Sequence, residues 1–414
     1  MKISQCQSFL FVLGVISITI VFYYNIDLYK KYNLSTFDYE RSCKPRTSIA
    51  FSKNHKAASS TVQGILLRYG MNRDLNFVLP QIGNLLGHGF PFRKDYIALT
   101  PWAMANISYD IFAIHTVWNQ ETISEIMKPD TIYITILRDP VELFLSEWDY
   151  FEFEAILKTH LDDFVKLNNT KKTKLIQKSG IPQIGENQML RDLGLPIYSL
   201  NNQNAIQKKI EELNRDFHFV MIAEYFDESL VLLKELLCWN FDDIAYLKLN
   251  SRNSKAKKKL FTNITKEEVR HSLKSWLLGD YMLYDHFMEK FHNYYIPKIM
   301  GNKDLKTEVK VLKQKNTELK DKCVLKTVQE SHDINDPKFK LWKENIIGYE
   351  MTPECQYYGM KENVFIDVVR NKQTERMKDL YNVTPMGMEA QHIQSINDIN
   401  KKIQEFRIRK LRIP

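Results

Sequence analysis

Three times along the chain, a short run rich in β-branched and aromatic residues is followed by a turn and then by apolar residues at helical spacing. The runs cover residues 47–52, 131–137 and 217–223. After the first run, apolar residues recur at i, i+3, i+4 and i+7 from Ser59 onward, as on one face of a helix, until Gly70. Strands that alternate with helices predict an α/β fold with a central, mainly parallel sheet flanked by helices on both faces.

The composition is that of a globular protein with a modest positive charge. The 414 residues include 58 Lys and Arg against 50 Asp and Glu, a formal net charge of +8, and 44% are hydrophobic. This is enough apolar material for a large core, and the chain is neither collagen-like nor a Gly/Pro-rich low-complexity sequence. The positive charge suits an anionic ligand, but it is too small to indicate nucleic-acid binding, so we expect no nucleic-acid partner.

The N-terminal segment departs from this pattern because residues 3–26 contain no charged residue. A helix of this length, at about 1.5 Å per residue, exceeds the ~30 Å hydrocarbon core of a bilayer. We predict a short cytoplasmic tail at residues 1–7, an uncleaved transmembrane signal anchor at residues 8–26 and a stem at residues 27–45. A cleaved signal peptide is the alternative, but no small-residue cleavage site follows the apolar stretch.

Sequons and cysteines favour a luminal location for the rest of the chain. Four cysteines follow the anchor without metal-binding spacing, and two disulfides would fit an oxidising compartment. We favour Cys323 to Cys355 as one pair, with free buried thiols as the alternative. The prediction is a type II membrane protein with a luminal domain at residues 46–385 and an exposed basic tail at residues 386–414. Five Asn-x-Ser/Thr sequons lie beyond the anchor, at Asn33, Asn106, Asn168, Asn263 and Asn382.

Charged and hydroxyl side chains gather where the first predicted strand ends. The turn reads Lys53-Asn54-His55-Lys56-Ala57-Ala58-Ser59-Ser60-Thr61, which brings ammonium groups, an imidazole and hydroxyls to a helix N-terminus with unpaired N–H groups. This pattern predicts an anion site. It is not a Walker A loop, because no glycine lies between Lys53 and Thr61. A solvated lysine pair followed by a serine cap is the alternative interpretation.

A second cation stands at the end of the next predicted strand. Arg138 follows residues 131–137, and Ser146 lies eight residues further on, about two helical turns into the next helix. A guanidinium with a hydroxyl nearby can hold a second phosphate. The alternative is an Arg-Asp surface pair with a serine exposed on a helix.

The first turn closely resembles the K-T-H-K-T-A-S-S-T loop of the galactose-3-O-sulfotransferases. The chain departs from that loop at Asn54 and Ala57, where Thr is usual, and loss of a hydroxyl at Ala57 removes one possible phosphate donor. The resemblance implies a P-loop-like sulfotransferase fold in an enzyme anchored in the Golgi membrane with its catalytic domain in the lumen. Further matches to the family lie at residues 134–140, 222–230, 248–252 and 283–287.

What the resemblance implies is transfer of a sulfuryl group from 3′-phosphoadenylyl sulfate (PAPS) to the 3-hydroxyl of galactose on glycolipids or glycoprotein glycans. Arg138 and Ser146 would hold the 3′-phosphate, with Arg252 as a further candidate, and Lys56 would stabilise charge as the nucleotide leaves. The 5′-phosphosulfate would be held by residues of the first turn, namely Lys53, His55, Lys56, Ser59, Ser60 and Thr61.

A histidine is expected to take the proton from the acceptor hydroxyl. We predict His115, which ends a strand-like run at residues 109–114 and so projects at the same sheet edge as the first turn. Family members resemble the chain in carrying a histidine there. His55 is a further catalytic candidate, and His88 is a competitor that could instead shape the acceptor cleft. The alternative for His115 is a hydrogen-bonded structural histidine.

The acceptor site is expected to combine an aromatic platform with polar groups that bind sugar hydroxyls. Trp276, Tyr284 and His286 recur at helical spacing and are candidates, with a structural role in the core or at a cap as the alternative. No acidic cluster indicates a metal, so we expect no metal requirement. A type II Golgi glycosyltransferase and a catalytically silent galactose-binding relative remain alternative functions, and a homodimer is possible.

Overall fold

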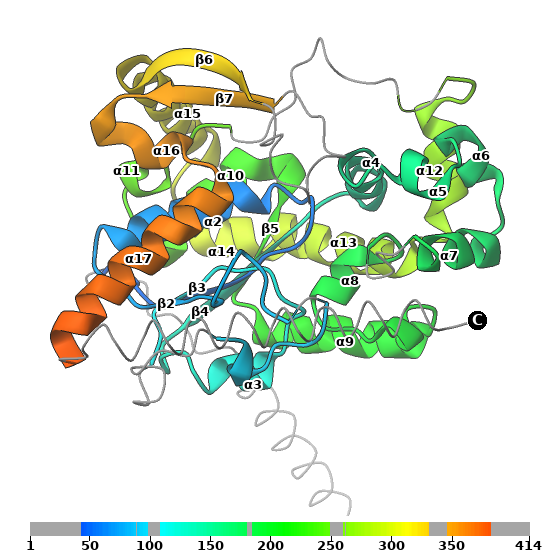
Figure 1. Ribbon diagram of the computed structural model, residues 1–414, viewed down its shortest axis with the longest axis horizontal. Helices are drawn as coiled ribbons and strands as arrows, with labels where there is room; N and C mark the ends of the chain where they lie inside the picture. The colour runs from blue at the N-terminus through cyan, green and yellow to red at the C-terminus, as the bar shows by residue number, and fades with distance from the viewer. Residues whose placement is uncertain are drawn as a thin grey trace, which may run out of the picture.

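A five-stranded parallel sheet forms the centre of the molecule (Figure 1). The computed structural model describes residues 43–87, 89–97, 108–179, 184–248, 260, 262–330 and 346–381. The strand order is β2-β3-β1-β4-β5, and every pairing is parallel. This confirms the predicted parallel α/β fold. The strands are β1 (Ile49–Ser52), β2 (Phe77–Val78), β3 (Ile111–Phe112), β4 (Ile132–Leu137) and β5 (Phe219–Ile222).

The three predicted strand runs contain β1, β4 and β5. Every residue of β1 and of β5 is buried, as expected for a sheet whose faces are both covered by helices. Helices lie on both sides of the sheet in the view of Figure 1. Because β1 lies between β3 and β4, the loops that follow these three strands meet at one edge of the sheet.

The helices that follow β1, β4 and β5 are those that the apolar spacing predicts. They are α2 (Ser59–Met71), which ends one residue after Gly70, α4 (Pro140–Tyr150) and α10 (Phe226–Leu237). The remaining α-helices as far as residue 323 are α3 (Gln120–Ser124), α5 (Phe153–Leu157), α6 (Leu161–Lys166), α7 (Asn169–Gln177), α8 (Gln188–Asp192), α9 (Gln203–Asp216), α11 (Phe241–Ile244), α12 (Lys266–Lys274), α13 (Leu278–Lys290), α14 (Ile296–Met300) and α15 (Leu305–Cys323). Shorter turns are the 3₁₀ segments η1 (Lys94–Tyr96), η2 (Ile197–Ser199), η3 (Ala223–Tyr225) and η6 (Pro353–Cys355) and the π-helical η5 (Phe291–Tyr295).

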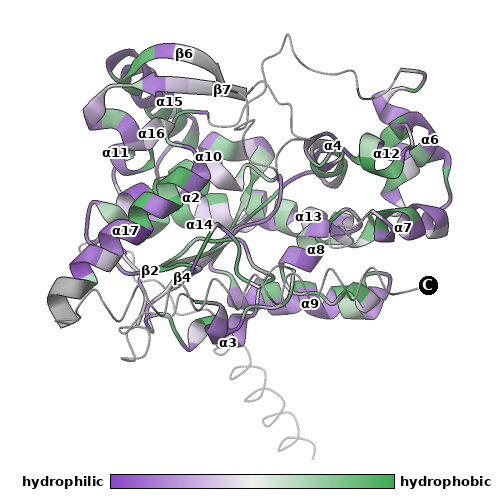
Figure 2. Cartoon of the chain, in the orientation of Figure 1, coloured by the Kyte–Doolittle hydropathy of each residue, from purple (hydrophilic) through white to green (hydrophobic). Residues whose placement is uncertain are grey.

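In the part of the chain that the structure describes, the buried hydrophobic side chains form two clusters. The larger surrounds the sheet, and in Figure 2 the strands of the central sheet are mostly hydrophobic whereas α9 carries both kinds of residue. The smaller lies among α4 to α7 and α12, where Phe144, Trp148, Phe164 and Trp276 pack ring against ring. The apolar side chains of α4 pack into this second cluster, which fixes the position of α4 and of the turn that precedes it.

From about residue 265 the sequence pattern predicts helices and becomes increasingly lysine-rich. Helices α12 to α15 follow residue 265 as expected, but β6 (Val324–Glu330) and β7 (Ile346–Met351) then pair as an antiparallel hairpin. The sequence did not predict this hairpin, because in β6 only Val324, Thr327 and Val328 are β-branched and lysine-rich segments surround the strand. The helices α16 (Gln356–Gly359) and α17 (Glu362–Tyr381) follow the hairpin.

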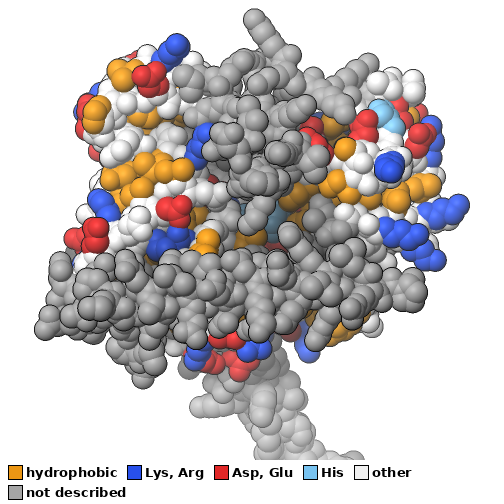
Figure 3. All heavy atoms as spheres, viewed as in Figure 1, with side chains coloured by type: hydrophobic (Ala, Val, Ile, Leu, Met, Phe, Trp, Pro, Cys, Tyr) orange, Lys and Arg blue, Asp and Glu red, His pale blue; other side chains and the backbone are white. Residues whose placement is uncertain are grey.

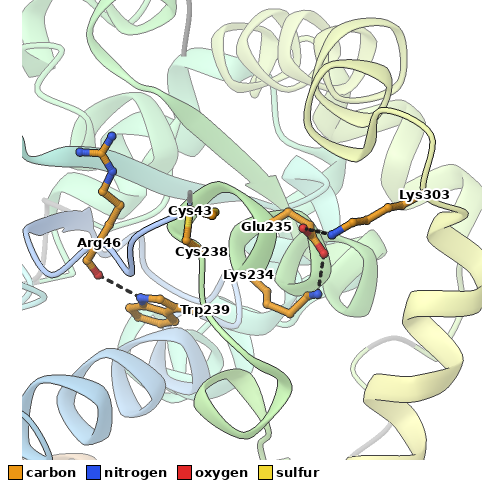
Figure 4. The surroundings of a disulfide bond; sticks show 7 residues. All are labelled: Cys43, Arg46, Lys234, Glu235, Cys238, Trp239 and Lys303. Atoms are coloured by element: carbon orange, nitrogen blue, oxygen red, sulfur yellow. Dashed lines mark hydrogen bonds and ion pairs between the residues drawn. A yellow bond between two sulfur atoms is a disulfide. The ribbon is translucent and has the colours of Figure 1, made fainter. Parts of the chain in front are cut away.

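Two disulfides lie within the described residues. The predicted pair Cys323–Cys355 is confirmed, and Cys43 pairs with Cys238. Figure 4 shows the surroundings of Cys43–Cys238, where the indole of Trp239 donates to the backbone oxygen of Arg46 at 2.9 Å. This bond and the disulfide tie the start of the described chain to the end of α10.

Several predictions fall on residues that the structure does not describe. These are the anchor, most of the stem and the basic tail, and also His88, Arg252, Asn33, Asn106 and Asn382. Within the described ranges, no helix has both the length and the apolar character needed to cross a bilayer. On the face drawn in Figure 3, positive and negative side chains are interspersed over the described part.

Candidate functional site

The loop between β1 and α2 has a strained backbone. Lys56 and Ala58 adopt left-handed conformations with φ of 52° and 61°, and such residues cost about 1–3 kcal/mol each. Ala58 is also the N-cap residue of α2, and its side chain makes no cap hydrogen bond. The N-terminus of α2 therefore leaves backbone N–H groups without a side-chain cap. Left-handed residues just before a helix arrange such N–H groups in a concave set that suits an anion.

Lys53, directly after β1, is held by a carboxylate from the C-terminal part of the chain. Its Nζ lies 2.8 Å from Glu362 Oε1 and 2.7 Å from His115 Nε2, and the residue is 2% exposed. Burial lowers the pKa of Lys53, and the Glu362 carboxylate opposes that shift. The ammonium is therefore directed at these two partners rather than at solvent.

The same carboxylate contacts the start of α2. Glu362 Oε2 accepts from Ser60 Oγ at 2.8 Å, and Oε1 also accepts from Asn84 Nδ2 at 2.9 Å. Burial would raise the pKa of Glu362, but Lys53 and the donated hydrogen bonds bring it below its ordinary value. Glu362 is thus an ionised group that joins β1, α2 and the segment after β2.

His55 is oriented by Asp192, the last residue of α8. Asp192 Oδ2 accepts from the His55 backbone N–H at 2.7 Å, and both carboxylate oxygens lie 2.9 Å from Nδ1. Gln188 Nε2 donates to Asp192 Oδ1 at 2.8 Å. Because a carboxylate only accepts, Nδ1 carries a hydrogen, and Nε2 is the acceptor nitrogen of the neutral ring. This arrangement is typical of a general base, here His55, whose ring is oriented by a carboxylate, here Asp192.

The two histidines of the site stack, with ring centroids 4.4 Å apart and planes inclined by 23°. Burial lowers the pKa of His115 well below its ordinary value, and the nearby charge of Lys53 lowers it further. His115 is therefore neutral. Its Nε2 is occupied by Lys53, and its buried Nδ1 has no hydrogen-bond partner among the residues described.

Arg138 follows β4, as predicted, and reaches across to the first loop. One guanidinium nitrogen, NH1, donates to the backbone oxygen of Lys56 at 2.8 Å. Ser146 lies half-buried on α4. The structure therefore brings Arg138 and the loop of Lys56 together at one edge of the sheet, because β1 and β4 are neighbours.

Lys56 also meets an aromatic ring that sequence reasoning missed. Its Nζ lies 3.5 Å from the ring centroid of Tyr150, the last residue of α4. A cation over an aromatic face is attracted by the ring quadrupole. Lys56 is thus placed between the two strand ends, with its backbone contacting Arg138 and its side chain contacting α4.

The hydroxyl groups predicted to hold an anion are partly engaged by the protein. Ser59 Oγ donates to the backbone oxygen of Asn54 at 2.5 Å, and Ser60 Oγ donates to Glu362. The backbone N–H of Thr61 donates to Ala58 at 3.2 Å. What Ser59 and Ser60 offer an incoming anion is therefore chiefly their backbone N–H groups at the start of α2.

The two positions that depart from the family loop both face the protein interior. Asn54 is fully buried, and its Nδ2 donates to the backbone oxygen of Ile136 at 2.9 Å, which links the loop to β4. Ala57 is fully buried in the larger core cluster. The Ala57 methyl group therefore packs inward and does not face the start of α2 from the solvent side.

The described acceptor candidates are engaged elsewhere. Trp276 is 1% exposed in the smaller core cluster, and its Nε1 donates to Thr173 Oγ1 at 3.0 Å. The Tyr284 hydroxyl donates to Glu224 Oε2 at 3.0 Å. His286 is exposed on α13. The prediction that Trp276 forms an aromatic platform for the acceptor sugar was wrong, because its ring packs against other core rings and not at a surface.

The two carboxylates of the site, Asp192 and Glu362, were not found from the sequence. Asp192 is 137 residues from His55, and Glu362 is 309 residues from Lys53. Neither belongs to a motif, so the one available signal was that buried cations require anionic partners. Within the described ranges, no group of three or more potential ligands could hold a metal ion.

Comparison with known proteins identifies the relatives of this chain. The family model described as galactose-3-O-sulfotransferase matches residues 1–362. The galactosylceramide sulfotransferase of Mus musculus is 30% identical over 340 residues, which cover 76% of this chain and 78% of that protein. Galactose-3-O-sulfotransferase 2 of Mus musculus is 31% identical over 317 residues, covering 74% of this chain and 78% of the relative. Galactose-3-O-sulfotransferase 3 of the same organism is 28% identical, with 81% of each chain covered.

Proposed function

Since the chain belongs to the galactose-3-O-sulfotransferase family, a family of sulfotransferase enzymes, we propose that it transfers a sulfuryl group from PAPS to the 3-hydroxyl of galactose. The observation that carries this proposal is the uncapped N-terminus of α2, with Lys56 in the loop before it. A donor with a phosphosulfate group needs a site of this kind. The acceptor is a galactose-terminated glycolipid or glycoprotein glycan.

The donor is proposed to lie across the two strand ends. Lys56 and the backbone N–H groups of Ser59 and Ser60 would bind the 5′-phosphosulfate, and Arg138 with Ser146 would bind the 3′-phosphate. The contact of Arg138 with the backbone of Lys56 supports this assignment, because one donor molecule has to span both groups. Lys53 is assigned a different role, since its ammonium is directed at Glu362 and His115.

His55 is proposed as the general base. Its Nε2 takes the proton of the 3-hydroxyl while the galactose oxygen forms a bond to sulfur and the bond from sulfur to the bridging phosphate oxygen breaks. Asp192 stabilises the imidazolium that forms, and Lys56 neutralises charge on the departing phosphate oxygen. His115 is the second candidate for the base, and its contact with Lys53 favours a supporting role.

Substitution of each histidine separates the two candidates. His55→Ala should lower kcat by about 10²–10⁴-fold, the usual contribution of a general base, while donor binding is kept. His115→Ala should lower kcat less. A larger loss of kcat in His115→Ala than in His55→Ala would instead make His115 the base, and equal loss of PAPS binding would make either residue a donor ligand.

We also propose that the chain is a single-pass type II protein of the Golgi membrane with its catalytic domain in the lumen. The uncharged stretch at residues 3–26 supports an anchor, and the two disulfides fit an oxidising compartment. The sequon residues Asn168 and Asn263 are exposed. Protease protection in sealed microsomes tests the topology, and a mobility shift on deglycosylation tests the luminal location.

The activity is tested with radiolabelled PAPS and a panel of galactosylceramide, lactose-type and N-acetyllactosamine acceptors, with mannose and uronic-acid controls. We expect label on galactose at the 3-hydroxyl, and the preferred acceptor decides between glycolipid and glycan. PAPS binding without transfer to any galactoside would indicate a silent relative. Transfer of sugar from a sugar nucleotide, without PAPS binding, would indicate a glycosyltransferase and contradict the proposal.

A further inference from the structure

The helix α17 is fixed against the sheet by its middle turns. Phe365, Ile366 and Val369 are buried in the larger core cluster. The side-chain amide of Gln373 pairs with the edge strand β2, accepting from Phe77 N–H at 2.6 Å and donating to the Phe77 oxygen at 3.1 Å. The amide thus satisfies backbone groups that an edge strand leaves open.

The same helix also holds the chain segment after β2. Arg370 Nε donates to the backbone oxygen of Pro80 at 3.1 Å, and its NH2 donates to that of Gly83 at 2.8 Å. Asn84, the next residue, donates to Glu362. Because α17 is bound to the core, to β2 and to this segment, its first residue, Glu362, has a defined position beside Lys53.

From Glu362 a continuous chain of contacts runs to the proposed base. Glu362 pairs with Lys53, Lys53 contacts His115, the His115 ring stacks on His55, and His55 is bound by Asp192. An ammonium has three N–H donors and no acceptor. While Lys53 is charged, it therefore donates to His115 Nε2 and fixes His115 as the tautomer with hydrogen on Nδ1.

We propose that Glu362 is a positioning residue of the transfer site, which keeps Lys53 charged so that Lys53 fixes the tautomer and orientation of the His115 ring against which His55 stacks. This inference rests on the proposed function. The carboxylate acts through Lys53 and His115 and touches neither donor nor acceptor in this account. Residues from the far end of the described chain thereby complete the site formed at the ends of β1 and β3.

The proposal predicts a change in the pH dependence of transfer. The charged and titratable groups around Lys53 and its partner His115 are Glu362 on α17, Asp192 on α8, and His55 and Lys56 in the loop after β1. Glu362 is the nearest anion among them. Without its charge, Lys53 loses its proton at lower pH, so the alkaline limb of the kcat profile moves to lower pH.

Glu362→Gln in the full-length protein tests this, because glutamine keeps the size of the side chain and an acceptor oxygen while removing the charge. The alkaline limb of kcat should move down by about one pH unit or more, the usual effect of one nearby opposite charge. Below that limb, kcat should approach the wild-type value, and the KM for PAPS should change less than twofold. The matched control is Glu375→Gln, an exposed residue of the same helix, which should leave the whole profile unchanged.

A second readout is independent of activity. Long-range ¹H–¹⁵N spectra of ¹⁵N-histidine-labelled protein, assigned with His115→Gln, should show His115 as the Nδ1–H tautomer in the wild type and a changed tautomer pattern in Glu362→Gln at pH 8. Unchanged spectra together with an unchanged kcat profile would overturn the role of Glu362. If the wild type transfers no sulfuryl group, the proposed function fails, whereas the tautomer result still decides the inference.

Discussion

The helices α2 and α4 follow neighbouring strands, β1 and β4, but the N-termini of the two helices are capped differently. After β4, Asp139 caps α4, because its Oδ1 accepts from the N–H groups of Val141 and Glu142 at 3.1 and 3.0 Å. Arg270 of α12 pairs with the other oxygen of Asp139 at 2.6 Å. The N-terminus of α4 is thus occupied by a carboxylate from its own sequence.

After β1, the N-cap residue of α2 is Ala58, which supplies no such carboxylate. The anions of this loop come instead from distant helices, and they bind side chains, with Asp192 on His55 and Glu362 on Lys53 and Ser60. The start of α4 is therefore capped by a residue of its own sequence, whereas the start of α2 is left without a carboxylate cap and its side chains are held by long-range contacts. A ligand anion fits the second.

Among the changes that test this comparison of the two helix starts, the largest effect is expected from removing the cation at the start of α2. Lys56→Ala should lower kcat by about 10²–10³-fold, the usual cost of losing one group that stabilises developing charge. Steady-state kinetics with PAPS and the preferred galactoside measure it. Lys208→Ala, an exposed lysine on α9, is the control and should keep full activity. A folded Lys56→Ala protein with unchanged turnover would remove the proposed loop mechanism.

Removing the charge of a distant carboxylate should have the next largest effect. Asp192→Asn should lower kcat by about a hundredfold, within the range for general-base catalysis, because the imidazolium of His55 loses its counter-charge. The KM for PAPS should change little. Asp163→Asn, exposed on α6, is the control. A loss confined to donor affinity would show that His55 and Asp192 bind the donor.

The difference between the two helix starts can also be removed by giving α2 an N-cap aspartate like that of α4. Ala58→Asp places a carboxylate at the N-cap of α2, where it competes with the donor for the N–H groups and repels its charge. The Kd for 3′-phosphoadenosine 5′-phosphate should rise by about 10–100-fold, equivalent to ~1.4–2.7 kcal/mol. Calorimetric titration measures it, with Ala58→Asn as the uncharged control of equal shape. Equal affinity in the two variants would place the donor elsewhere.

The smallest effect concerns stability at the closed end. Glu147 of α4 is fully buried, and neither carboxylate oxygen has a partner in the part of the chain described. Burial raises the pKa of Glu147 well above its ordinary value of 4.5, and Asp192 and Asp280 raise it further. The folded state therefore binds the proton more tightly than the unfolded state, so stability falls as pH rises from about 4.5 through the folded-state pKa.

Glu147→Gln removes this titration. Its Tm should exceed that of the wild type at pH 8, by the equivalent of about 1–3 kcal/mol for one unsatisfied buried group, and the difference should shrink toward pH 5. Thermal unfolding at both pH values measures it. Glu121→Gln, exposed on α3, is the control. A difference in Tm that is the same at both pH values would exclude titration of Glu147 as the cause.

The sheet was largely predictable because its central strands carry a strong local signal. The runs that contain β1, β4 and β5 are apolar and are followed by helical spacing, so each could be placed to within about two residues. The strand β2 was missed, since two residues, Phe77 and Val78, give no periodicity. The hairpin of β6 and β7 was missed because its residues lie between lysine-rich segments.

The site was predictable only in part, and the limit is physical. The motif of residues 53–61 indicates an anion site because cations, hydroxyls and a helix start are adjacent in sequence. The roles of its cations depend on Asp192 and Glu362, which tertiary packing brings to the loop. No local sequence pattern predicts that Lys53 contacts Glu362 or that Ala57 packs into the core.

The central claim is that the donor anion binds the open start of α2 and not the capped start of α4. Amide hydrogen–deuterium exchange of the full-length protein, with and without saturating 3′-phosphoadenosine 5′-phosphate, tests it directly. The account predicts slower exchange in peptides that cover residues 53–62 and unchanged exchange at residues 140–143. Slower exchange confined to residues 140–143, or none at residues 53–62, would contradict it.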